Sequence, residues 1–138
     1  MAKSITQLMT ANPCSIDVEK PVAYAAQMMR DEDVGLAPIV EGDRLVGTLT
    51  DRDIAIRVVA EGKDPQTTKV RDVASTDIVT IDPQQDLDEA LRLMSQHQVR
   101  RLPVVEEDGR LVGVVAQADI ARQASERKTG ALVEEISQ

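Results

Sequence analysis

One pattern occurs twice in this sequence, and the repeat constrains the fold more than any other feature. Residues 34–41 (VGLAPIVE) return as residues 99–106 (VRRLPVVE), an offset of 65 positions, and residues 44–47 (RLVG) return unchanged as residues 110–113. A fixed internal period of this length indicates two copies of one supersecondary unit. The offset grows by one residue between these two matches, which places the extra residue in a turn, where insertions are tolerated.

Each copy contains the spacing of one amphipathic helix. Apolar residues occur at i, i+3, i+4 and i+7 in both copies, as Val22, Ala25, Ala26 and Met29 and as Leu87, Ala90, Leu91 and Met94. This period places the four side chains on one face of a helix. Asp86, followed three residues later by Glu89, is typical of a helix N-terminus. We therefore expect one core-facing helix in each half.

A β-hairpin is predicted after this helix. Runs rich in β-branched residues enclose a short polar turn in each copy, at 37–40 and 45–49 and at 102–105 and 111–115. A second helix is then expected to begin near Asp51 or Gln117. Gly62 is typical of the C-terminal end of such a helix.

Each half is expected to open with a brief strand, near residues 15–16 and 79–81, after a helical turn at 5–9 and 70–74. The order of elements is then β-α-β-β-α, twice. Neither half alone has enough residues for a comfortable core. We therefore predict an α+β fold in which the two units pack together about a pseudo-twofold axis.

The repeat boundaries are expected at residues 6–64 and 70–128, separated by a turn-rich linker. A tail or short helix is expected at 129–138. It either covers the core or touches a second subunit.

Charge and composition exclude several classes of protein. The chain of 138 residues carries a formal net charge of −8, which opposes general binding to nucleic acid. No apolar run is long enough to span a membrane, and the first residues lack a signal-peptide pattern. Cys14 is the only cysteine, which fits a reducing compartment. We expect a cytoplasmic protein without nucleic-acid or membrane partners.

The repeated residues resemble the CBS domain, which usually occurs as a tandem pair called a Bateman module. The strongest matches are residues 45–54 (LVGTLTDRDI) and 97–105 (HQVRRLPVV), and the resemblance extends over roughly residues 6–128. The chain is similar to stand-alone bacterial proteins with two CBS units. This resemblance implies tandem CBS repeats that bind AMP, ADP, ATP or S-adenosylmethionine between them. It also implies a homodimer.

One motif of the resemblance carries candidate ligand contacts. The family's Gly-x-x-Thr/Ser-x-x-Asp run is matched by Gly47, Thr50 and Asp53. A carboxylate can accept hydrogen bonds from both ribose hydroxyls, so Asp53 would hold the sugar while Thr50 donates to phosphate. The same spacing is also a helix capping box, in which the two side chains only satisfy backbone N–H groups. Both interpretations stay open at this point.

The second copy keeps Asp119 but has Ala116 where the hydroxyl belongs. We therefore expect unequal sites, with the Asp53 cleft occupied first and the Asp119 cleft weak or empty. The resemblance implies that the opposite repeat completes each cleft. The Asp53 cleft would be completed by Ile78, Thr80, Ile81, Arg100 and Arg101, and the Asp119 cleft by Cys14, Ile16, Gly35 and Leu36.

The two arginines are expected to reach the phosphate of the nucleotide, since a guanidinium pairs with phosphate through two parallel donors. The alternative is that Arg100 and Arg101 are solvated or pair with surface carboxylates.

No catalytic or metal site is expected, and no motif requires a cofactor. His97 is the only histidine, so neither a His- or Cys-rich metal site nor a supported Cys–His pair is available. The sequence thus favours a regulatory module that senses an adenosyl ligand, acts as a homodimer and contacts an unknown protein partner. The alternative is an oligomerisation or protein-interaction module without bound nucleotide.

Overall fold

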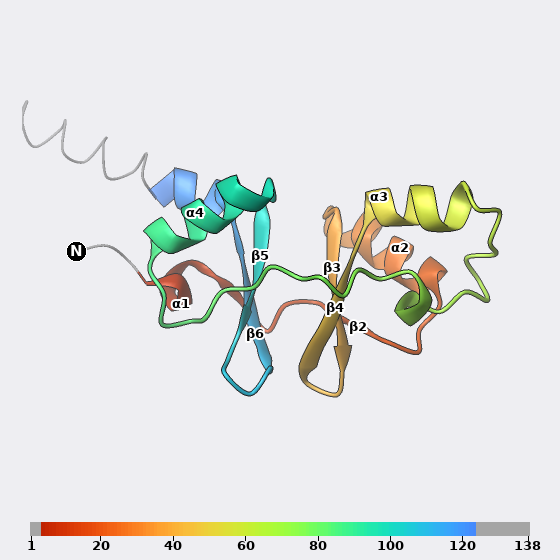
Figure 1. Cartoon of the computed structure of the whole chain (residues 1–138), viewed down its shortest axis with the longest axis horizontal. Coiled ribbons are helices and arrows are strands. Elements are labelled where there is room, and N and C mark those ends of the chain that lie inside the picture. The colour runs from red at the N-terminus through yellow and green to blue at the C-terminus, as the bar shows by residue number, and fades with distance from the viewer. Residues whose placement is uncertain (1–3, 124–138) are drawn as a thin grey trace, which may run out of the picture.

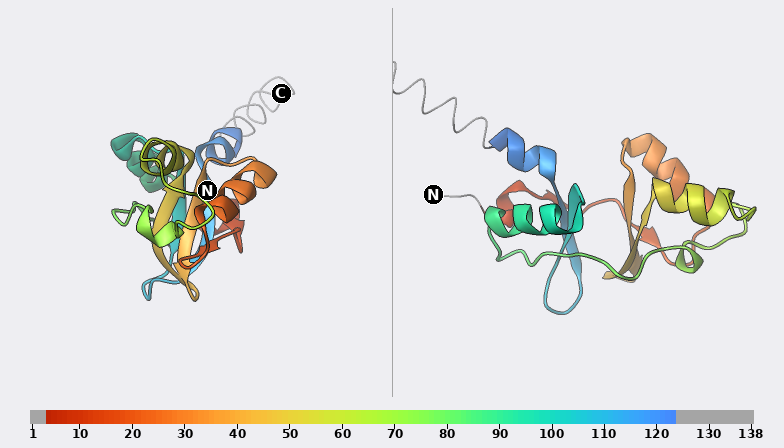
Figure 2. Two further views of the ribbon diagram at one scale, coloured as in Figure 1. Left: turned by 90° about the vertical axis from the view of Figure 1, so that its right-hand side faces the viewer. Right: turned by 45° about the horizontal axis from the view of Figure 1, so that its top comes forward.

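The computed structural model describes residues 4–123, so the tail predicted at 129–138 lies outside the described residues. Two halves lie side by side, each with a three-stranded sheet (Figure 1). The helices α2, α3 and α4 gather toward one end of the two hairpins, and the hairpin turns lie at the other end (Figures 1 and 2). The predicted α+β fold with two repeated units is confirmed.

The first half contains the sheet β2-β3-β4, with β2 parallel to β3 and β3 antiparallel to β4. Its elements are β2 (Ile16–Asp17), α2 (Val22–Glu32), β3 (Leu36–Glu41), β4 (Arg44–Thr50), α3 (Asp51–Asp53) and the π-helix η1 (Ile54–Val59). The helix that follows β4 thus starts at Asp51, as predicted. Gly62, whose φ of 71° lies in the left-handed region, is in the turn after it.

The second half contains the sheet β1-β6-β5, in which both pairings are antiparallel. Its elements are α1 (Ile5–Leu8), β1 (Thr10–Ala11), α4 (Leu87–His97), β5 (Arg101–Val105), β6 (Leu111–Ala116) and a helical segment over residues 117–123. The brief strand predicted near 79–81 is reduced to one parallel bridge between Ile81 and Val104.

The two halves exchange their opening segments. Strand β1, near the start of the chain, pairs with β6, and Ile5 of α1 is fully buried in the core of the second half. In return, Val70 and Val73, in and after the 3-10 helix η2 (Val70–Asp72), are buried in the core of the first half. The boundaries predicted from the sequence therefore mark the repeat along the chain, while the packing crosses them.

The core is aliphatic, and both predicted helix faces contribute to it. Val22, Ala25 and Met29 of α2 and Leu87, Ala90 and Met94 of α4 are buried. Leu91 departs from the prediction, because its side chain is 40% exposed.

The hairpin turns of the two halves are joined by a symmetric pair of hydrogen bonds. The N–H of Leu45 donates to the carbonyl oxygen of Gly109 over 3.0 Å, and the N–H of Leu111 donates to that of Asp43 over 3.0 Å. These residues occupy equivalent positions in the repeat, as do Arg44 and Arg110, which form an antiparallel bridge between them. The arrangement is that of two units related by a pseudo-twofold axis.

Candidate functional site

The Thr50–Asp53 motif forms a capping box at the start of α3. The N–H of Thr50 donates to Oδ2 of Asp53 over 3.0 Å, and the N–H of Asp53 donates to Oγ1 of Thr50 over 3.0 Å. The other carboxylate oxygen of Asp53 lies 3.9 Å from Nε of Arg57, which itself donates from Nη1 to the carbonyl of Val73. The capping-box interpretation of this motif is therefore confirmed. Oδ1 of Asp53 takes no part in the capping box and can accept hydrogen bonds from another group.

Ile81, which was predicted to line a base pocket, has its side chain in a hydrophobic core. Its side chain is 3% exposed and packs in the core of the second half. Its N–H donates to the carbonyl of Pro103 and its carbonyl accepts from the N–H of Val105. Ile16, the equivalent residue of the other cleft, is likewise fully buried in a core. Ile78 and Thr80 are half-buried.

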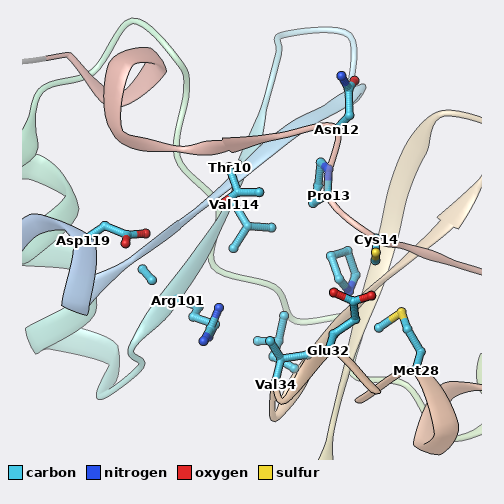
Figure 3. Close-up of a pocket in the computed structure, with 13 residues that line it drawn as sticks. Thr10, Asn12, Pro13, Cys14, Met28, Glu32, Val34, Arg101, Val114 and Asp119 are labelled. Carbon is cyan, nitrogen blue, oxygen red and sulfur yellow. The ribbon is translucent and has the colours of Figure 1, made fainter. Parts of the chain in front are cut away.

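A cavity of about 240 Å³ lies at the seam between the halves, on the side of Asp119. Cys14 of the first half and Asp119 of the second line it (Figure 3). Leu36, also named for this cleft from the resemblance, is a further lining residue. Its apolar wall comes from both halves, through Met28, Val34, Pro38 and Val114. The cleft expected to be weak or empty thus contains a formed cavity.

Three charged side chains line this cavity. Asp119 is half-buried and accepts a hydrogen bond from Arg122 over 2.8 Å, and Glu32 is the last residue of α2. The guanidinium of Arg101 lies between these two acids in Figure 3. The family resemblance implied that Arg101 serves the Asp53 cleft, whereas its side chain lines the cavity that contains Asp119.

Glu32 and Met28 were missed by the sequence analysis, although a signal for them exists. Both belong to the C-terminal half of the predicted helix, which leads directly into β3 and so ends at the seam.

A larger groove of about 920 Å³ adjoins the cavity, and Leu36, Arg101 and Ala116 line both spaces. The groove brings together Thr50, Arg100 and Arg101, which were predicted to serve one phosphate. Asp53, Ile78 and Thr80 do not line either of these two spaces. The predicted site residues are thus divided between a cavity beside Asp119, a groove beside Thr50 and the capping box.

The metal-ligating side chains do not gather within residues 4–123. No group of three or more His, Cys, Asp or Glu residues in this range is placed to hold a metal ion. Cys14 is exposed between β1 and β2, and His97 ends α4. In the same range, no helix has the length and apolar character needed to cross a bilayer.

A scan against protein families finds the CBS domain twice, at residues 3–60 and 70–126. The chain belongs to the CBS domain family. The CBS domain-containing protein YhcV of Bacillus subtilis is 42% identical over 135 residues, which are 97% of this chain and 95% of YhcV. This relative therefore consists of little beyond its CBS pair.

Two solved CBS structures have the same fold. Hypoxic response protein 1 of Mycobacterium tuberculosis is 43% identical over 86% of this chain and 83% of its own length. A crystal structure of Hypoxic Response Protein I with two coordinated zinc ions superposes with a TM-score of 0.80 at 41% identity, covering 87% of this chain and 98% of that one. CBSX2 in complex with AMP superposes with a TM-score of 0.80 at 23% identity, covering 92% and 99%, and supports the fold alone.

Proposed function

We propose that this CBS pair is a non-catalytic regulatory module that binds an adenosyl ligand at the seam between its repeats and acts as a homodimer. The observation that carries the proposal is the cavity, which is lined by Asp119 and by apolar side chains from both halves. A carboxylate is suited to the two hydroxyls of a ribose, and Arg101 to a phosphate. The solved complex of CBSX2 with AMP supports this ligand class for the fold.

The walls of the cavity suit the base of such a ligand. Met28, Val34, Pro38 and Val114 are apolar, and ligand pockets are lined mainly by apolar side chains around a few polar groups. The volume of about 240 Å³ is somewhat below the usual range of about 300–1,000 Å³, so the cavity fits the nucleoside while a phosphate chain extends outside it. Tyr24, the only aromatic residue, does not line it, so no ring stacks on the base and we expect moderate affinity.

The Asp119 cleft is our proposed primary site, in place of the Asp53 cleft favoured by the sequence. Asp53 has one oxygen committed to the capping box, and the side chain of Ile81 opposite is in the core. Asp119 instead lines a formed cavity with Arg101. The Asp53 cleft stays the alternative, and matched variants distinguish the two.

Thermal-shift and calorimetric titrations with AMP, ADP, ATP, NAD and S-adenosylmethionine test the proposal. A ligand at about one hundred times its dissociation constant is expected to add roughly 2.7 kcal/mol of stability. Asp119→Ala is expected to weaken binding at least about tenfold, since hydrogen bonds to a charged group are lost, while Asp53→Ala leaves the affinity nearly unchanged. The opposite result would assign the ligand to the Asp53 cleft. If none of the five compounds binds, the result would favour an oligomerisation module without nucleotide.

The homodimer is proposed from an apolar surface on the helix after β4. Val59 is 70% exposed and Ile56, three residues earlier, is 47% exposed, although both are large apolar side chains. Two such residues on one turn of a surface helix are favourable contacts for a second subunit. Regulation through the dimer further requires that the ligand binds one arrangement of the subunits more tightly than the other.

Val59→Asp tests this surface, because a buried unpaired carboxylate opposes association. We expect the variant to sediment as a monomer while keeping its circular dichroism spectrum. Leu91→Asp, on α4 of the other half, is the matched control, since Leu91 is also exposed. If both substitutions dissociate the dimer equally, or if neither does, the interface lies elsewhere.

A further inference from the structure

Three arginines at the groove have no acidic partner in the described part of the chain. Arg52, Arg100 and Arg101 line it, and none of them lies within 4.0 Å of a carboxylate oxygen among residues 4–123. Arg30 and Arg92, by contrast, both form ion pairs. In a chain with a net charge of −8, three arginines that line one groove and form no ion pair among residues 4–123 make a local positive field that favours an anion.

The other uncharged polar side chains of the groove can donate hydrogen bonds to an anion. Thr50 contributes a hydroxyl, and Gln98 and Gln117 contribute side-chain amides. Asp51 is the one acid among the lining residues, and its Oδ1 already accepts a hydrogen bond from the N–H of Arg52 over 2.8 Å. Glu32 and Asp119 line the adjoining cavity and not the groove. Positive charge therefore exceeds negative charge among the residues that line this space.

The size of the groove and the positions of the arginines indicate an extended anion. The groove measures about 920 Å³, far more than one orthophosphate fills. Arg52 is in the first turn of the helix after β4, whereas Arg100 and Arg101 stand at the start of β5 in the other half. The cations thus approach the groove from both repeats, so an anion that contacts all three has to carry charge along its length.

We propose that this groove binds a linear polyphosphate chain without needing a nucleoside. Each guanidinium can pair with phosphate oxygens through two parallel N–H donors, and three of them match the repeated charges of such a chain. The site is separate from the proposed adenosyl cavity, but Arg101 lines both. If the proposed function holds, polyphosphate in the groove lowers the affinity for a nucleotide phosphate at Arg101, and the effect is reciprocal.

Calorimetric titration of the full chain with sodium tripolyphosphate, without divalent cations and at constant ionic strength, tests this site. We expect saturable binding of one tripolyphosphate per chain, at least about tenfold tighter than orthophosphate. Arg52→Gln and Arg100→Gln are each expected to weaken it about tenfold, as loss of a charged hydrogen-bond pair does. Arg30→Gln is the matched control, because it removes the same charge from an exposed position on α2.

Two results would overturn the proposal: tripolyphosphate that binds no more tightly than orthophosphate, or an equal loss of affinity in Arg30→Gln. A parallel titration with adenosine separates the polyphosphate groove from the adenosyl cavity, since adenosine carries no phosphate. If adenosine binds and tripolyphosphate does not, the polyphosphate site is refuted and the adenosyl cavity is supported. If tripolyphosphate binds and adenosine does not, the adenosyl cavity is refuted and the polyphosphate site is supported.

Discussion

Thr50 and Asp53 stabilise the first turn of the helix after β4 without any ligand. Each side chain accepts a hydrogen bond from the backbone N–H of the other residue, at 3.0 Å in both directions. The first N–H groups of a helix have no partner within it, so these two bonds satisfy donors that would otherwise need water. A substitution here therefore changes stability as well as any ligand contact.

Thr50→Ala is expected to lower the free energy of unfolding by about 1 kcal/mol, the usual cost of losing a helix cap. Thr50→Ser keeps the hydroxyl and is expected to lose much less. Urea unfolding followed by circular dichroism measures both. An equal loss in the two variants would mean that the methyl group, and not the cap, carries the effect.

At this scale the sequence predicted the motif but not the direction of every side chain. The spacing of Thr50 and Asp53 indicated the capping box as one of two interpretations, and the structure contains it. In extended segments, however, neighbouring residues face opposite sides, and a shift of one position exchanges core and surface. Spacing alone therefore did not show that Ile81 packs in the core, or that Arg101 and Asp119 line the same cavity.

Strand β4 is held against the segment that follows the linker by a close backbone approach. The N–H of Thr48 donates to the carbonyl of Ser75 over 2.9 Å, and the N–H of Ser75 donates back over 2.8 Å. A Cβ added at Gly47 would lie 2.9 Å from that carbonyl oxygen, closer than side-chain atoms normally come. Gly47 was recognised from the sequence as part of a ligand motif, while its close approach to Ser75 depends on a partner distant in the chain.

Gly47→Ala is expected to destabilise the protein by about 1–3 kcal/mol, because backbone has to move to admit the methyl group. Val46→Ala is the control, since the Val46 side chain is 36% exposed on the same strand. Thermal unfolding compares them. A loss in Gly47→Ala no larger than in Val46→Ala would contradict the close approach.

Over the whole molecule, the exchanged opening segments tie the stability of the two halves together. Ile5 is buried in the second core although most of its own repeat forms the first, and Val70 is buried in the first. The internal repeat predicted two packed units, because a repeat is visible along the chain. The exchange was not predictable in this way, since both halves offer an equivalent apolar site for the helical turn.

Ile5→Ala tests this coupling with Tyr24 as the probe. Tyr24 is the only aromatic residue and lies on α2, in the half that does not contain Ile5. Truncating a buried Ile costs about 2–5 kcal/mol, so we expect the tyrosine fluorescence and circular dichroism transitions in urea to shift together to lower concentrations. A tyrosine transition that stays in place while the other shifts would show that the halves unfold independently.

The most direct test of the central claim is a crystal structure of this chain grown with AMP. We expect density for the nucleotide at the seam, with the ribose hydroxyls on Asp119, the base against Met28 and Val34, and the phosphate at Arg101. An occupied Asp53 cleft beside an empty Asp119 cavity would contradict the proposed site. If the crystals are grown at an AMP concentration that saturates the protein in solution and the seam still contains no AMP, the claim that this CBS pair holds its ligand between the repeats would be contradicted.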